Sequence, residues 1–165
     1  MNIAGQIIVA LLSSSEAAAV PAPAGWSPGP SGQISFSEGG APVYLLECKA
    51  TEVVVTQFGV TQLVDLQSNR PVADTEGTVL PPGAALMALA TDKTDEPNMV
   101  PAAAVRNPGK GWDMTIGLPK SDPGLLSLPR AKYVSLFTTG FTRASELGKA
   151  DRKLFADFLG KCRGK

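Results

Sequence analysis

Glycine and proline interrupt this chain so often that short strands are favoured over a fold built from long helices. The 165 residues include 17 glycines and 14 prolines, and both residue types break helices and favour turns. Between these breaks lie short apolar runs rich in β-branched residues, which are typical of strands. The sequence therefore predicts many short strands joined by tight turns.

The strand signals recur along most of the chain. Strands are predicted at Gln33–Phe36, Val43–Lys49, Glu52–Phe58, Val60–Leu66, Gly77–Leu80, Ala84–Thr91, Val100–Arg106, Trp112–Leu118, Lys132–Thr139 and Phe141–Arg143. Turn signals separate them, including Ser121–Gly124. We expect a mainly β, single-domain antiparallel β-sandwich or barrel of about 8–10 short strands. One C-terminal α-helix completes the predicted fold.

The predicted helix covers residues 149–162. Its apolar residues recur at helical spacing and form one stripe, made of Leu154, Phe155, Phe158, Leu159 and Cys162. Asp151 lies where an acidic side chain favours a helix start, and Lys161 lies where a cation favours its end. We therefore expect the helix to lay its apolar stripe on the sheet.

Cys48 and Cys162 are the two cysteines of the chain. Strand alternation places Cys48 on the same face as Tyr44 and Leu46, and Cys162 belongs to the apolar stripe of the helix. Both sulfur atoms should therefore point inward from their own elements. In an exported chain, such a pair predicts a disulfide. In a reducing compartment, two buried thiols are the alternative.

The first residues resemble an export signal. Ile7–Leu12 is an apolar run that is too short to span a bilayer, and Ala17–Ala19 fits the small residues of a cleavage site. We interpret residues 1–19 as a signal peptide, although no Lys or Arg precedes the apolar run. A Pro/Gly-rich segment, 20–42, then leads to a β domain, 43–165. The mature chain, without a transmembrane segment, is expected to be periplasmic or secreted. The alternative is an ordinary N-terminal strand or helix.

Positive charge is concentrated at the C-terminal end of a chain whose formal net charge is zero. Six cations are candidates for a basic patch: Arg130, Lys132, Arg143, Lys149, Arg152 and Lys153. Such a patch would suit an anionic envelope component or an acidic protein. The stacking aromatics expected of a nucleic-acid binder are not interleaved with it. A solvated helix with a basic tail is the simpler interpretation.

The sequence contains no histidine. This excludes Ser-His-Asp and Cys-His catalytic sites and any zinc site that uses histidine, and two cysteines are too few for a closed thiolate site. No phosphate-binding glycine motif is present. We therefore assign no catalytic, cofactor-binding or metal-binding residue.

Two loops carry weaker signals. The segment 92–98 contains Asp92, Asp95, Glu96 and Asn98, whose oxygens could bind calcium but equally suit an exposed turn. The segment Arg106–Trp112 places two cations beside an aromatic ring, as a ligand-binding loop would. A plain hairpin turn explains it as well.

The function that fits these observations is a non-catalytic binding or envelope-interaction module outside the cytoplasm. Two alternatives remain open. A hydrolase-type enzyme could use carboxylates that meet only in the folded chain. A subunit of a larger surface assembly would keep a β edge exposed until a partner covers it. The sequence identifies no ligand.

Overall fold

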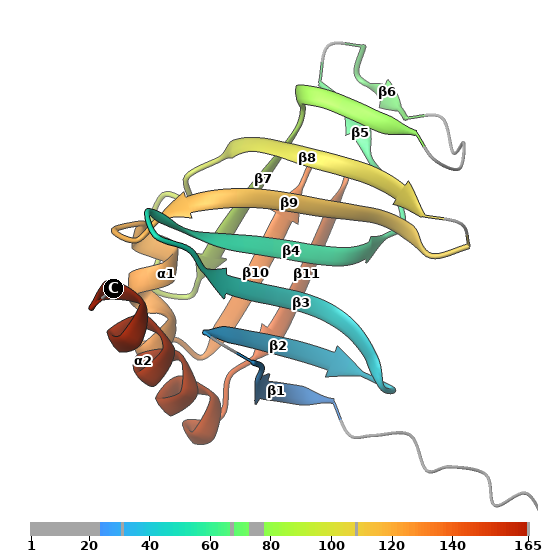
Figure 1. Ribbon diagram of the computed structural model, residues 1–165. Helices are drawn as coiled ribbons and strands as arrows, with labels where there is room; N and C mark the ends of the chain where they lie inside the picture. The colour runs from blue at the N-terminus through green and yellow to red at the C-terminus, as the bar shows by residue number, and fades with distance from the viewer. Residues whose placement is uncertain (1–23, 31, 67, 73–77, 108, 165) are drawn as a thin grey trace, which may run out of the picture.

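Nine strands form one antiparallel sheet in the computed structural model, which describes residues 24–30, 32–66, 68–72, 78–107 and 109–164. The sheet order is β1-β2-β3-β4-β9-β8-β7-β10-β11 (Figure 1). Its strands are β1 (Gly25–Pro28), β2 (Gln33–Glu38), β3 (Ala41–Cys48), β4 (Glu52–Val60), β7 (Val79–Thr91), β8 (Val100–Asn107), β9 (Gly111–Pro119), β10 (Tyr133–Thr138) and β11 (Phe141–Glu146). A separate small ribbon joins β5 (Val64–Asp65) to β6 (Arg70–Pro71). The predicted signal peptide lies outside the described residues.

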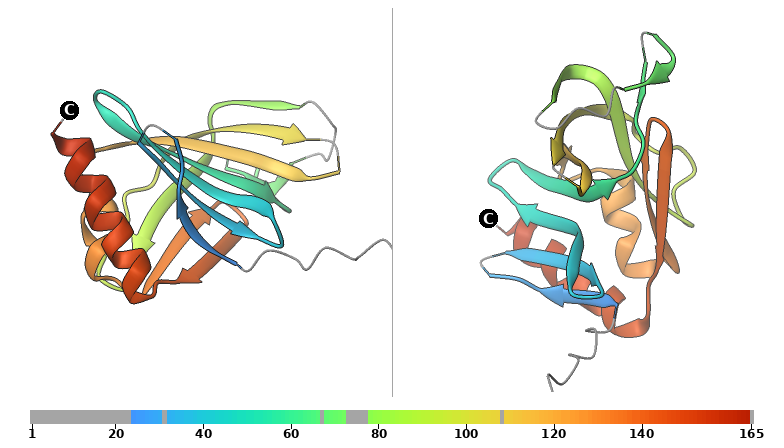
Figure 2. Two further views of the ribbon diagram at one scale, coloured as in Figure 1. Left: turned by 60° about the horizontal axis from the view of Figure 1, so that its bottom comes forward. Right: turned by 90° about the vertical axis from the view of Figure 1, so that its right-hand side faces the viewer.

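The sheet curls over itself, so that β10 and β11 pass behind β3 and β4 (Figures 1 and 2). The long strand β7 makes this possible, because it pairs with β8 along one part and with β10 along another. One end of the curl is covered by α2 (Lys149–Arg163), together with α1 (Pro123–Ser127) and the 3₁₀ turn η1 (Leu128–Arg130). The predicted mainly β fold of many short antiparallel strands with a C-terminal helix is confirmed.

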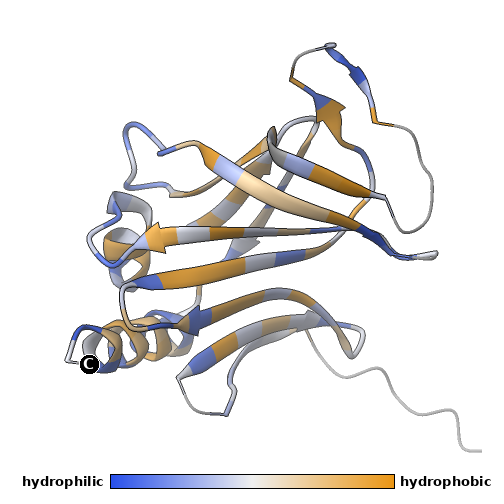
Figure 3. Ribbon diagram, turned by 45° about the horizontal axis from the view of Figure 1, so that its top comes forward, coloured by the Kyte–Doolittle hydropathy of each residue, from blue (hydrophilic) through white to orange (hydrophobic). Residues whose placement is uncertain are grey.

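The core lies between the two layers of the curled sheet. Burial alternates along the strands, as the pleat requires, and Figure 3 shows apolar and polar residues alternating along them. On β9, the inward residues are Trp112, Met114, Ile116 and Leu118, all of them buried.

Helix α2 buries the predicted stripe against the sheet. Phe155 is fully buried (0 % exposed), and its ring lies 4.8 Å from that of Trp26 on β1. The helix begins after Gly148, whose N–H donates to the Asp151 carboxylate at 2.8 Å. This bond satisfies one of the amides that a helix start leaves without a partner.

Three predicted strands differ from the structure. Val60–Leu66 is not one strand: β4 continues to Val60, and only Val64–Asp65 of the remainder is extended in a ladder. Gly77–Leu80 and Ala84–Thr91 are not separate, since β7 runs through both from Val79. The intervening prolines fall where the pairing with β8 shifts between Leu80 and Ala85, and a shift of this kind tolerates proline. Gly77 lies outside the described residues.

Four short elements were missed: β1, β6, α1 and η1. β1 lies in the Pro/Gly-rich segment, and α1 begins inside the predicted turn Ser121–Gly124. The Asp122 carboxylate accepts a hydrogen bond from the Leu125 N–H at 3.2 Å, so Asp122 caps α1. Glycine is required at position 124, because a Cβ there would approach the Leu89 carbonyl oxygen to 2.2 Å.

None of the helices in the described part of the chain combines the length and the apolar character needed to cross a membrane.

Candidate functional site

A groove of about 900 Å³ opens at the end of the curled sheet opposite α2. β3 connects the two ends, because it begins in the groove at Ala41 and ends beside α2 at Cys48. The left view of Figure 2 shows α2 at one end and the β2–β3 and β8–β9 hairpins at the other. The groove is lined by Glu38, Ala41, Pro42, Val43, Phe58, Gly59, Asn107, Lys110, Asp113 and Arg143.

An irregularity in β4 shapes the groove. The pairing of β4 with β9 shifts register between Gln57 and Val60, so that Phe58 and Gly59 leave the regular ladder and line the groove. Gly59 has a positive φ of 70°, which glycine adopts without strain. Opposite it, Gly111 has a φ of 88°, and a Cβ there would lie 2.7 Å from the Val60 carbonyl oxygen. The backbones of β4 and β9 approach so closely here that only glycine fits at position 111.

The rim of the groove carries both signs of charge. Arg143 on β11 forms an ion pair with Glu38 on β2, which links the two layers across the mouth. The Asp113 carboxylate accepts hydrogen bonds from the Asn107 amide and, at 3.4 Å, from the Gly59 N–H. Both acids of the rim therefore have structural partners.

Lys110 differs from the other charged groups of the rim. It is exposed in the β8–β9 hairpin, and its ammonium group has no hydrogen-bond or ion-pair partner within the described residues. The neighbouring floor of the groove is apolar and includes Pro42, Val43 and Phe58. A free cation beside an apolar floor can attract a ligand that combines an acidic group with an apolar body.

No protein-family model, curated protein or solved structure matches this chain. Its function must therefore be inferred from the chemistry of its own residues.

Unpaired polar groups lie in the interior close to the groove. Gln57 directly precedes Phe58 and is fully buried (0 % exposed), yet both atoms of its amide lack a hydrogen-bond partner among the described residues. Tyr44 is the residue opposite Gln57 in the β3–β4 ladder. Its buried hydroxyl has the Ser145 side chain nearby but makes no hydrogen bond of standard geometry among the described residues. Burial raises the pKa of Tyr44 to about 12, and the nearby Ser145 and Arg143 side chains oppose this shift. Tyr44 is therefore neutral at physiological pH.

Replacing Gln57 by methionine should raise the stability of the protein. Methionine has a similar size, and it removes an amide whose burial without partners costs about 1–3 kcal/mol. Urea denaturation should show a higher free energy of unfolding for Gln57→Met. The control is Gln33→Met, because the Gln33 amide donates to Glu47 at 2.6 Å and its loss should destabilise. A destabilised Gln57→Met variant would contradict the assignment of Gln57 as an unpaired group.

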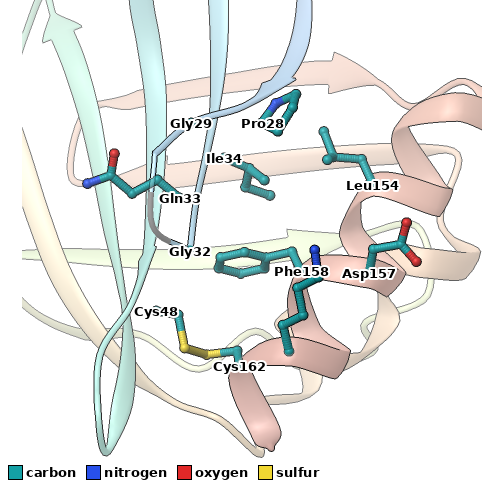
Figure 4. A pocket seen from close by; sticks show the side chains of 11 residues that line it. Pro28, Gly29, Gly32, Gln33, Ile34, Cys48, Leu154, Asp157, Phe158 and Cys162 are labelled. Carbon is teal, nitrogen blue, oxygen red and sulfur yellow. A yellow bond between two sulfur atoms is a disulfide. The ribbon is translucent and has the colours of Figure 1, made fainter. Parts of the chain in front are cut away.

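A second, smaller cavity of about 310 Å³ lies between α2 and the β1–β2 connection (Figure 4). Leu154 and Phe158 project into it from α2, and Ile34 projects from β2. The bonded Sγ atoms of Cys48 and Cys162 form part of its wall. The predicted disulfide is therefore present, and it fastens the last turn of α2 to the end of β3.

Four of the six cations predicted for the basic patch lie near the start of α2. The Leu147 N–H donates to the Lys132 carbonyl at 2.7 Å, and Arg152 donates to the Leu147 carbonyl at 2.7 Å. Arg130 ends η1, which packs against α2, and Lys149 is the first residue of that helix. These four positions surround the entry into α2.

The other two cations have different environments. Arg143 lines the groove and pairs with Glu38. Lys153 forms an ion pair with Asp157 at 3.0 Å, four residues further along α2. Sequence reasoning placed Arg143 with the helix because it could not show that β11 carries this side chain to the opposite end of the sheet.

Asp92, the first acidic residue of the turn after β7, has a structural role. The Asp92 carboxylate accepts hydrogen bonds from the Lys132 N–H at 2.7 Å and the Tyr133 N–H at 3.3 Å. The bond from Lys132 is the main reason that the pKa of Asp92 is lowered to about 2. No group of three or more potential metal ligands occurs among the residues that the structure describes.

Asp92 should make stability depend on pH in the acid range. Because its pKa falls on folding from about 4 to about 2, its contribution is complete above pH 4 and is lost as the pH falls towards 2. Asp92→Asn should therefore melt at a lower temperature than the wild type at pH 6, and the difference should vanish near pH 2. Thermal melts across this range, with Asp95→Asn as the control, test this. A difference in melting temperature that does not change with pH would contradict it.

Proposed function

We propose that this protein is an exported, non-catalytic binding module and that the groove opposite α2 is its ligand site. The observation that carries this proposal is the Lys110 ammonium, which has no partner among the described residues, beside the apolar floor that contains Phe58. Its ligand would bring an acidic group to Lys110 and an apolar or aromatic body to Phe58. An anionic component of the cell envelope, or an acidic side chain of a partner protein, has this chemistry.

The carboxylates of the rim favour binding over catalysis. A general acid or base needs a carboxyl group that is free to exchange a proton with the substrate. Glu38 is paired with Arg143, and Asp113 is held by Asn107 and Gly59. We infer that these acids fix the shape of the groove and accept hydrogen bonds from a ligand.

The fluorescent probe 8-anilinonaphthalene-1-sulfonate tests the groove, because it joins an aromatic body to a sulfonate. We expect saturable binding to the folded protein, weakened by salt. Phe58→Ala and Lys110→Gln should each weaken binding at least about threefold, the loss expected from one apolar contact or one exposed ion pair. Fluorescence titration measures both effects.

Lys149→Gln is the matched control, because Lys149 is an exposed lysine at the opposite end of the molecule. Its affinity for the probe should equal that of the wild type. Near-ultraviolet circular dichroism must show native packing in every variant, since partly unfolded chains also bind this probe. Equal affinities for the wild type, Phe58→Ala and Lys110→Gln would overturn the assignment of the groove.

Export to the periplasm or the medium is supported by the signal-like residues 1–19 and by a disulfide that suits an oxidising compartment. Intact mass of the protein recovered from its native host tests this directly. We expect the mass of residues 20–165, rising by about two protons when the disulfide is reduced. A full-length mass with two free thiols would overturn the proposed location.

A further inference from the structure

The sheet has two edge strands, β1 and β11, and they differ in how well they are protected. β1 has four residues, ends in Pro28 and packs against α2. β11 has six residues without proline and pairs with β10 without a shift in register. Proteins usually protect an exposed edge with proline, a bulge or a covering element. β1 has such protection, whereas β11 has none of these three within the part of the chain that the structure describes. The charge of Arg143 on β11 is already neutralised by its ion pair with Glu38.

The pairing of β10 with β11 determines which backbone N–H and C=O groups of β11 point to its free edge. The Leu147 N–H donates to the Lys132 carbonyl, so this pair is hydrogen-bonded. Hydrogen-bonded and non-bonded pairs alternate in an antiparallel ladder, and the register with β10 is regular. Thr142, Ala144 and Glu146 therefore turn their N–H and C=O groups away from β10. All three residues are exposed, and their backbone groups have no other partner within the described chain.

This edge is complementary to itself. In an antiparallel pair of β11 strands with Ala144 at the two-fold axis, Thr142 faces Glu146 of the second copy. Arg143 then faces Ser145 of the second copy, so no like charges are opposed. A shift of the axis to residue 143 would oppose two arginines. The register centred on Ala144 pairs all three outward-facing residues and would form about six backbone hydrogen bonds.

We propose that a second copy of this chain binds at β11, so that the two curled sheets join into one continuous sheet across a two-fold axis. The outer face beside the edge supplies apolar area: Tyr133 on β10 is 48 % exposed, and Phe137 on the same face is half-buried. In the dimer, side chains of the two copies line up across the outer face. Tyr133 and Glu146 of one copy lie in line with Thr142 and Phe137 of the second copy. The proposed dimer does not depend on the ligand proposed for the groove, although Arg143 of β11 lines the groove and lies within the proposed interface.

Sedimentation of the purified full chain over a range of concentrations tests this proposal. The wild type should show a monomer–dimer equilibrium. Ala144→Lys should raise the dissociation constant about tenfold or more, because it places two ammonium groups side by side at the axis. The matched control is Ala103→Lys: Ala103 is also an exposed alanine on a strand, but β8 is paired on both sides. It should leave the dissociation constant unchanged.

A cross-link tests the register without depending on the lysine variant. Ala144→Cys should form a covalent dimer on mild oxidation, because the Cα atoms of a hydrogen-bonded pair lie about 5.5 Å apart, a separation that a disulfide accepts. Thr142→Cys should not link to itself, because the pairing places it opposite residue 146. A wild type that stays monomeric, unchanged dimerisation of Ala144→Lys, or no cross-linking of Ala144→Cys would each overturn the proposal.

Discussion

Replacing both Cys48 and Cys162 by serine is expected to lower the free energy of unfolding by about 4–5 kcal/mol. The disulfide closes a loop of 114 residues, and a bridge across so long a loop strongly restricts the unfolded chain. In the native state, it also holds the last turn of α2 beside the end of β3. Urea denaturation of the wild type and of the double serine variant, with and without reductant, measures the loss.

The reduced wild type is the internal control for this prediction. It should unfold at the same urea concentration as the double serine variant, because both lack the cross-link while the rest of the chain is nearly the same. Reductant should leave the variant itself unaffected. A loss below about 1 kcal/mol would contradict the stabilising role of the bridge, since native disulfides typically contribute 2–5 kcal/mol.

Phe155→Ala is expected to cost about 3–5 kcal/mol, the usual range for removing a buried phenylalanine side chain. Phe155 is fully buried and packs edge-on against Trp26. Trp26 in turn lies within 5.8 Å of the rings of Phe36 and Tyr44. The ring therefore connects α2 to an aromatic cluster from the first three strands, and its loss leaves a cavity at that junction.

Chemical denaturation of Phe155→Ala with the disulfide intact measures this effect. Lys153→Ala is the control, because Lys153 lies on the same helix and its side chain is exposed. It should change the stability by about 0.5 kcal/mol at most. If Phe155→Ala were equally mild, the packing of α2 against the curled sheet would not depend on the aromatic cluster.

Local patterns predicted most of the strands and the helix correctly. Alternation along Trp112–Leu118 and the apolar stripe Leu154–Cys162 both reflect burial of one face, which a short window of sequence records. The errors arose where tertiary structure overrides a local signal. The prolines after Leu80 end a strand in isolation, yet β7 accommodates them at a shift in register.

The groove could not be predicted in the same way. Its lining comes from β2, β3, β4, β11 and the β8–β9 hairpin, and these meet only because the sheet curls. The sequence did single out the loop that contains Lys110, but a hairpin turn explained it equally well. The position of Arg143 opposite Glu38 depends on a contact between residues 105 apart in the chain, for which a single sequence carries no local signal.

The strand order also has a consequence for the speed of folding. Neighbouring strands of the large sheet are consecutive in the chain except at two junctions, β4–β9 and β7–β10. The hairpins on either side of these junctions involve short loops and can form early, whereas each junction requires distant parts of the chain to meet. We therefore expect the pairing of β4 with β9, from Glu52 opposite Pro119 to Val60 opposite Trp112, to limit the folding rate. Until it forms, two separate meanders with unsatisfied edges coexist, and aggregation competes with folding during that interval.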